Sequence, residues 1–207
     1  MTFREDFSAP TIPDLMARGW GLKQETNGGR LALATFGWWP RRRALVATAP
    51  GGVKAKASLM RPIPRVSDGG IICVRQSLWL DDTNDASLLF LCDLEDSTVG
   101  NMGLRLRLRG QPGDQRLAVD LESVGSVTPL ATRVFPRRRW VTVEWQVALG
   151  NPGRVVLVQD GIRVLDAIAQ TSAAPMTGVD RLEVGVTINA SPAAHEVRVD
   201  WVEVETP

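Results

Sequence analysis

Apolar and polar residues alternate with a period of two along most of this chain, in short runs broken by Gly, Pro and Asn/Asp clusters. Successive side chains of a β-strand point to opposite faces, so such alternation predicts strands with one buried face. No window carries the three-to-four-residue apolar spacing of an amphipathic helix. The pattern therefore predicts an all-β chain with under about a tenth of its residues in helices.

The segment 103–122 indicates how neighbouring strands pair. Leucine and valine alternate there with arginine and aspartate on both sides of a glycine-containing loop. Pairing across this loop places Leu106 beside Val119 and Arg105 beside Asp120, which predicts a hairpin with one solvated face.

Asp160 and Gly161 form the strongest short turn signal, because both central positions of a two-residue hairpin loop need positive φ. They join the last two strands of a predicted three-strand meander over residues 140–168. About a dozen predicted strands are too many for one flat sheet, which would curl or split into two layers. Since no composition shift marks a boundary, we expect residues 1–207 to form a single domain, a two-sheet antiparallel β-sandwich.

Charge and hydropathy exclude several classes of function. The chain carries 24 basic and 23 acidic residues, so no net field attracts nucleic acid or an anionic membrane. No stretch approaches the roughly 20 apolar residues of a membrane span, and the start lacks the apolar centre of a secretory signal. We therefore expect no nucleic-acid or membrane partner, and a chain that is cytoplasmic or carried in an assembly such as a virion.

Cys73 and Cys92, the only cysteines, lie inside apolar runs, which favours buried, reduced thiols over a disulfide. If residues 81–85 close a hairpin, its register sets Cys73 opposite Asp93 and Cys92 opposite Val74. The two thiols would then point to opposite faces, so we expect them not to be bonded to each other.

Three segments follow one another in a recognisable order: residues 3–8 with a tryptophan at 20, a tryptophan-led hairpin over 137–167, and paired closing strands over 178–205. This series resembles the concanavalin A-like lectin and glucanase jelly rolls. The resemblance covers nearly the whole chain and implies a jelly-roll sandwich of the concanavalin A-like type. It also implies binding or cleavage of polysaccharide on the concave sheet and, in some members, a structural calcium ion on the convex side.

The sequence departs from the catalytic patterns of that superfamily. Glucanase-like members carry two glutamates flanking an aspartate on one strand, whereas the nearest run here has Asp93, Glu95 and Asp96. Alginate-lyase-like members use a tyrosine with histidine or asparagine and arginine, but this chain has no tyrosine and one histidine, His195. We therefore expect a non-catalytic module, with an atypical glycoside hydrolase that uses Asp93 and Glu95 as the enzymatic alternative.

Arginine and tryptophan are the candidate ligand-binding residues, because tryptophan offers a flat face to a sugar ring and arginine a fork of donors. Arg105 and Arg107 project from one strand face, where they either bind acidic groups along a glycan or stay solvated beside Asp120. Arg75 and Trp79 share a face of another strand, which is the candidate concave platform unless a loop covers the tryptophan.

Trp38 and Trp39 open the sequence WWPRRR, and a similar segment, FPRRRW, precedes a later strand. These segments are either loops that seal the sandwich edge or a pair of ligand loops. By the resemblance, Asp200 in the closing strand and Asp6 near the start form the candidate calcium site.

Two classes of function remain open. The first is a lectin-like carbohydrate-binding module whose partner is a poly- or oligosaccharide. The second is a structural or assembly protein, such as a virion or tail component, whose partners are other protein subunits. Neither calls for a cofactor beyond the structural calcium.

Overall fold

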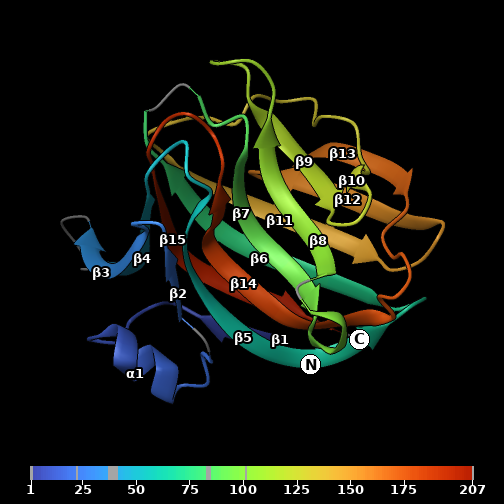
Figure 1. Cartoon of the computed structure of the whole chain (residues 1–207), viewed down its shortest axis with the longest axis horizontal. Coiled ribbons are helices and arrows are strands. Elements are labelled where there is room, and N and C mark those ends of the chain that lie inside the picture. Colours follow the sequence, from blue (N-terminus) through green and yellow to red (C-terminus); the bar gives the residue numbers. More distant parts are fainter. Residues whose placement is uncertain (1, 22, 37–41, 83–84, 101, 207) are drawn as a thin grey trace.

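The computed structural model describes the whole chain except residues 1, 22, 37–41, 83–84, 101 and 207. Its strands form two antiparallel sheets stacked face to face (Figure 1). Sheet A contains, in spatial order, β13 (Ile162–Ala169), β12 (Gly153–Gln159), β11 (Trp140–Ala148), β6 (Ile71–Leu80), β15 (His195–Glu205), β4 (Arg42–Ala49) and β3 (Arg30–Phe36), with β1 (Thr2–Glu5) against β15. Sheet B contains β10 (Gly125–Ser126), β9 (Arg116–Leu121), β8 (Met102–Arg109), β7 (Leu89–Asp96), β14 (Gly178–Asn189), β5 (Ala55–Ser67) and β2 (Lys23–Thr26). The short helices are α1 (Ile12–Ala17) and η1 (Ser97–Val99).

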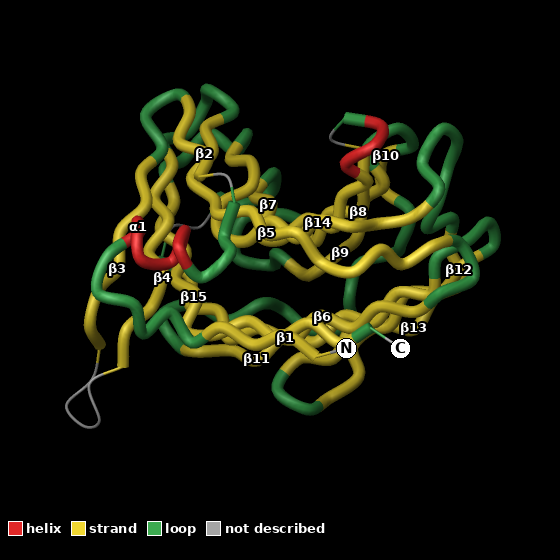
Figure 2. The backbone as a smooth tube through the Cα atoms, turned by 90° about the horizontal axis from the view of Figure 1, so that it is seen from below, coloured by secondary structure: helices red, strands yellow, loops and turns green. Residues whose placement is uncertain are grey.

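This architecture is the all-β, two-sheet antiparallel jelly-roll sandwich that the sequence predicts. Apolar side chains from both sheets fill the space between them in one continuous cluster, which includes the fully buried Leu106 and Trp145. In Figure 2, sheet B lies above sheet A, and both ends of sheet B curve upward, with β3 and β4 of sheet A alongside the β2 end. The outer face of sheet B is therefore the inside of a curve.

The two predicted hairpin regions are confirmed. β8 pairs with β9 so that Leu106 lies opposite Val119 and Arg105 opposite Asp120. β11, β12 and β13 form the predicted meander, and the turn residues Asp160 and Gly161 have φ of 50° and 76°. Local alternation and turn chemistry are sufficient to predict these regions.

The predicted hairpin between β6 and β7 is wrong. β6 pairs with β11 and β15 in sheet A, whereas β7 pairs with β14 and β8 in sheet B, because the chain crosses between the sheets after Leu80. Cys73 and Cys92 are nevertheless buried and unbonded, as expected, but they belong to different sheets.

Several elements were not predicted from the sequence: the strand β4, the short strands β1, β2 and β10, and both short helices. β4 (Arg42–Ala49) was missed as a strand, and α1 has only six residues, too few for an apolar stripe. The side chain of Thr11 caps α1, and Asp14 completes the capping box. No helix in the described part of the chain is long and apolar enough to cross a membrane.

Candidate functional site

The register of sheet B brings charged residues from three strands together on its outer face. β7 carries Asp93 and Glu95 two positions apart, so both side chains point to the same side. The register sets Asp93 between Arg105 of β8 and Glu183 of β14, and it sets Glu95 beside Arg181 of β14. Side chains that are distant in sequence therefore meet.

Asp93, Glu95 and Glu183 form a carboxylate triad whose oxygen atoms lie within 4.8 Å of one another. Arg181 Nε donates to Glu95 Oε2 at 2.7 Å, and Arg105 Nε lies 3.4 Å from Asp93 Oδ2. The spacing of the triad would suit a common cation. The two guanidinium groups already supply the compensating charge, so the triad is better described as a buried ion-pair network.

The triad is shielded from water, with at most 1% of each residue exposed. Thr187 Oγ1 donates to Asp93 Oδ1 at 2.8 Å, and the Ser58 hydroxyl donates to Glu183. Burial and the nearby charge of Glu183 raise the pKa of Asp93 well above its usual value and the pKa of Glu95 to about 7. Burial also raises the pKa of Glu183. The triad therefore carries less than its full negative charge at neutral pH.

Three arginines follow one another on the outer face of β8 and form the arginine row: Arg105, Arg107 and Arg109. Arg105 Nη2 lies 2.6 Å from Glu122 Oε1, and Arg107 Nε lies 3.0 Å from Asp120 Oδ2. Arg109 differs, because it is exposed and has no carboxylate partner among the described residues. Its Nη1 donates to the neutral Ser126 Oγ at 2.6 Å.

A pocket of about 550 Å³ opens beside the last two members of the arginine row. We call it the arginine pocket; it is lined by Ser87, Leu88, Arg107, Arg109, Gly110, Gln111, Pro129 and Leu130. Leu88 and Leu130 are 40% and 36% exposed. Two cationic side chains beside two exposed leucines offer a charged and an apolar contact at once.

The predicted platform residues Arg75 and Trp79 lie on the outer face of sheet A, on the opposite side of the molecule from the arginine row. Arg75 Nε donates to Glu144 at 2.7 Å, and the Arg198 guanidinium lies 4.2 Å from the centre of a Trp79 ring. A sugar could stack on that face of Trp79 only if Arg198 moved. The structure thus separates the predicted ligand residues into two groups, and Trp38 and Trp39 lie outside the described residues.

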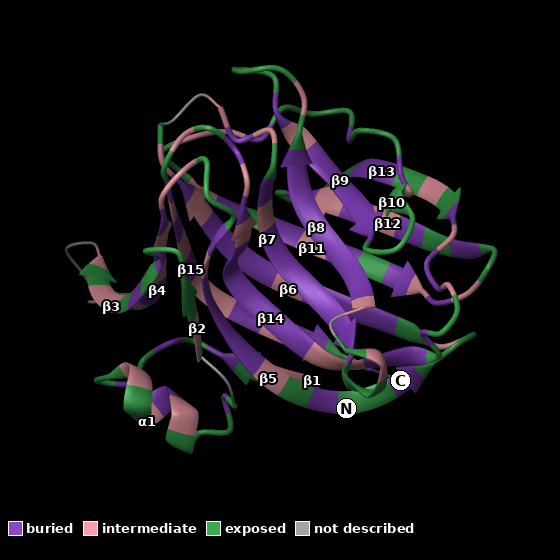
Figure 3. Cartoon of the chain, viewed as in Figure 1, coloured by how far each residue is buried: buried purple, intermediate pink, exposed green. Residues whose placement is uncertain are grey.

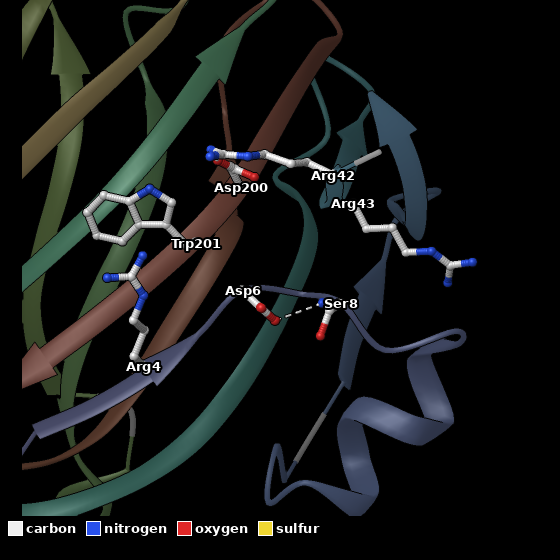
Figure 4. Close-up of a pocket in the computed structure, with 7 residues that line it drawn as sticks. All are labelled: Arg4, Asp6, Ser8, Arg42, Arg43, Asp200 and Trp201. Atoms are coloured by element: carbon white, nitrogen blue, oxygen red, sulfur yellow. Dashed lines mark hydrogen bonds and ion pairs between the residues drawn. The ribbon is translucent and has the colours of Figure 1, made fainter. Parts of the chain in front are cut away.

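Asp6 and Asp200 line one pocket of about 390 Å³, as Figure 4 shows, but three arginines line it as well. Arg42 Nη1 lies 3.3 Å from Asp200 Oδ2, and Asp6 Oδ1 accepts from the Ser8 backbone N–H at 3.0 Å. The hydrogen bonds to Ser8 lower the pKa of Asp6. As arranged, this donor set does not fit a calcium ion, because Arg42 would have to release Asp200 first.

Sequence reasoning missed Glu183 and Arg181, the β14 members of the network. The alternation in residues 181–186 places both on the face opposite Leu182 and Val184. Only the pairing of β14 with β7 brings them to Asp93, and no local signal encodes that long-range pairing.

Comparisons with known proteins identify the fold and no family. No family model and no curated protein matches the chain. The solved structure of the cellulose-induced protein Cip1 gives a TM-score of 0.69 at 15% identity, covering 98% of this chain and 96% of that one. An endo-β-1,4-glucuronan lyase from the fungus Trichoderma reesei gives 0.62 at 14% identity, covering 99% and 95%. A variant of the alginate lyase Aly36B, in complex with an alginate tetrasaccharide, gives 0.60 at 11% identity, covering 100% and 97%.

The likeness covers nearly the whole of these chains, so the two-sheet jelly-roll sandwich expected from the sequence is confirmed. Proteins of one such fold perform many unrelated functions, and at these identities the likeness establishes the fold alone. The function has to be argued from the site.

Proposed function

We propose that this chain is a non-catalytic carbohydrate-binding sandwich that binds an acidic glycan in the arginine pocket. The observation that carries the proposal is Arg109, an exposed guanidinium without a carboxylate partner among the described residues, beside Arg107 in the pocket wall. A carboxylate of the glycan would supply the missing partner through charge-assisted hydrogen bonds. Leu88 and Leu130 would contact the apolar side of the sugar ring.

The neighbours in fold support an acidic ligand. The names of two of them specify glucuronan and alginate, which are polyanions. Their likeness to this chain lies in the fold, so the ligand class proposed here depends on the chain's own arginines.

Binding is better supported than cleavage. Elimination needs a side-chain base beside the sugar, yet the chain has no tyrosine, and the side chain of His195 is fully buried at the start of β15. Hydrolysis needs two carboxyls that reach the scissile bond, yet Asp93 and Glu95 are at most 1% exposed and face guanidinium groups.

The test is a titration of the protein with neutral and uronic-acid oligosaccharides at low and high salt. We expect micromolar to millimolar affinity for the uronic-acid series and weaker binding at high salt, because exposed charge pairs are screened. Arg109→Gln should weaken binding about tenfold, which corresponds to about 1.4 kcal/mol.

Arg163→Gln is the matched control, because Arg163 is also an exposed arginine but lies on β13 of sheet A. It should leave the affinity unchanged. If the wild type binds no acidic glycan, or if Arg109→Gln binds as tightly as Arg163→Gln, the proposal is wrong.

A second candidate function, an assembly component, is favoured by the edge of sheet A. The edge strand β13 exposes 52% of Ile162 and 72% of Ile168. An edge strand presents unpaired backbone groups to which another chain can pair. Light scattering over a range of concentrations tests this role: an oligomer that Ile168→Lys dissociates would support it, and a monomer at every concentration would reject it.

A further inference from the structure

The single histidine of the chain is buried with both ring nitrogens facing oxygen acceptors. No part of the His195 side chain is exposed. Its Nδ1 lies 3.2 Å from Asp81 Oδ1, and its Nε2 lies 2.6 Å from the backbone carbonyl oxygen of Asp85. A neutral imidazole has one N–H and leaves the second nitrogen facing an oxygen without a proton, whereas an imidazolium donates to both. The contacts therefore select the protonated ring.

His195 and Asp81 are both fixed to the strand β15. The Glu196 backbone N–H donates to Asp81 Oδ2 at 2.8 Å, and the Asp81 N–H donates to the Glu196 carbonyl at 3.1 Å. The ring thus ties Asp85, in the connection between β6 and β7, to a strand of the core. Removal of its second N–H would leave the Asp85 carbonyl without this donor.

The connection held in this way continues into the wall of the arginine pocket. Asp85 Oδ1 accepts from the Ser87 hydroxyl at 2.9 Å and from the Ser87 N–H at 3.3 Å. The Leu88 carbonyl accepts from the Ala190 N–H at 3.1 Å. Ser87 and Leu88 line the pocket with Arg107 and Arg109, so a short series of hydrogen bonds links His195 to the proposed ligand site.

We propose that His195, as an imidazolium, is a positioning residue for the arginine pocket: it anchors residues 85–88, and this anchor weakens when the ring loses its proton. The ligand in this inference rests on the proposed function, whereas the anchor rests on the hydrogen bonds alone. Because only the protonated ring donates to both oxygen atoms, the anchor is complete while the ring carries both N–H protons and is lost when a rise in pH removes one of them.

The charged groups around the ring come from several elements. Asp81 and Asp85 supply the oxygen atoms that it faces, although the Asp85 carboxylate itself is bonded to Ser87. Arg30 of β3 and Glu196 of β15 line the same neighbouring pocket as the ring, and Arg137 acts electrostatically on Asp81. The carboxylate that contacts the ring directly is that of Asp81, and it favours the protonated form.

The test uses the fact that the chain has one histidine, so its ring signals in a ¹H–¹⁵N spectrum need no assignment. At about pH 5.5 we expect both ring nitrogens to be of the protonated type, with N–H protons protected from exchange. The backbone amides of Ser87 and Leu88 should shift along the same pH curve as the ring. The proposal would be overturned if one ring nitrogen were unprotonated at this pH. It would also be overturned if the chemical shifts of the two amides did not change with the protonation of the ring.

Two conservative variants, each replacing one carboxylate by an amide of nearly the same shape, extend the test. Asp81→Asn removes the charge that favours the imidazolium and should move the titration of the ring and of both amides to lower pH. Asp82→Asn is the matched control, since Asp82 pairs with the exposed Arg138, and it should leave the curve in place. A shift that is equal in both variants would contradict the assigned contact.

Glycan binding gives the last readout. The wild type should bind a uronic-acid oligosaccharide about three- to tenfold more weakly at about pH 8 than at about pH 5.5, and Asp81→Asn should show this loss at lower pH. Absence of glycan binding at every pH would reject the proposed function, while the amide titration would still decide the anchor.

Discussion

Two cross-strand pairs of arginine and carboxylate, one on the outer face of each sheet, have the same length and different surroundings. Arg181 Nε lies 2.7 Å from Glu95 Oε2 on sheet B, and Arg154 Nη2 lies 2.7 Å from Asp166 Oδ2 on sheet A. The side chains of the first pair are 23% and 1% exposed, and those of the second are 53% and 28% exposed. The difference indicates that burial, and not pairing geometry, separates the two faces.

Figure 3 shows the same contrast over whole strands. β8 and β14 of sheet B are buried along nearly their full length, whereas β12 and β13 of sheet A alternate between buried and more exposed residues. On β12 and β13 the side chains of Arg154 and Arg163 are more than half exposed. On sheet B the charged side chains shield one another, so the loss of one partner leaves a buried charge.

The largest expected effect is on stability. Above pH 7, where Glu95 is ionised, Arg181→Ala should lower the free energy of unfolding by about 3–5 kcal/mol, because it leaves that carboxylate buried and unpaired. Arg154→Ala removes an equally short but solvated pair and should cause a much smaller loss in the free energy of unfolding than Arg181→Ala. Equal losses in the two variants would remove the distinction between the faces.

The next effect is on the pH dependence of stability, which should have opposite signs on the two faces. Burial raises the pKa of Glu95 to about 7, so the folded state holds the proton more tightly than the unfolded state. Stability from this group is then present at low pH and is lost as pH rises from about 4.5 to about 7, a change of roughly 3 kcal/mol at about 1.4 kcal/mol per pKa unit. Glu95→Gln should flatten this part of the curve.

Asp166 provides the opposite case. Hydrogen bonds from Arg154 lower its pKa, so its contribution is present above the ordinary aspartate value and is lost as pH falls. Asp166→Asn should therefore alter the acid side of the stability curve and leave the region near neutrality unchanged. Denaturant unfolding of Glu95→Gln and Asp166→Asn across the pH range measures how each group changes the free energy of unfolding with pH. If both groups changed it in the same direction, the difference between the two faces would be refuted.

The smallest expected effect concerns calcium at Asp6 and Asp200. An ion at this pocket has to displace Arg42 from Asp200, so Arg42→Gln should bind calcium more tightly than the wild type. At ten times the dissociation constant the gain in stability is about 1.4 kcal/mol. A rise in Tm that Asp200→Ala abolishes would support the site, whereas melting curves without any response to calcium in the wild type and Arg42→Gln would rule it out.

The sequence was sufficient for the fold class and for pairings closed by a local turn, as in β8 with β9. It was insufficient where pairing depends on distant segments. Residues 81–85 look like a hairpin turn, and only the tertiary structure carries the chain from β6 to the other sheet. The alternation along β14 predicts that Glu183 lies on the face opposite Leu182 and Val184. Only the register of β14 against β7 shows that this face meets Asp93.

The candidate site was predicted in part for the same reason. The arginine row follows from strict alternation on one strand, so the common face of Arg105 and Arg107 could be predicted, while their role in ligand binding stays a prediction. The prediction for Trp79 placed it on the concave sheet, whereas β6 lies in sheet A. The alternation within one strand does not determine which of the two sheets that strand joins. Within the part of the chain that the structure describes, Arg109 alone of the row has no carboxylate partner, and this depends on β9 and its neighbours, which supply Asp120 to Arg107.

The central claim is that an acidic glycan binds on the sheet B side, and an amide map of the protein with a uronic-acid oligosaccharide tests it most directly. Titration followed by ¹H–¹⁵N spectra should shift the amides of Ser87, Leu88, Gly110 and Gln111 around the arginine pocket. Amides around Trp79 and Arg198 on sheet A should stay in place. Shifts confined to the sheet A face, with none at the arginine pocket, would contradict the account.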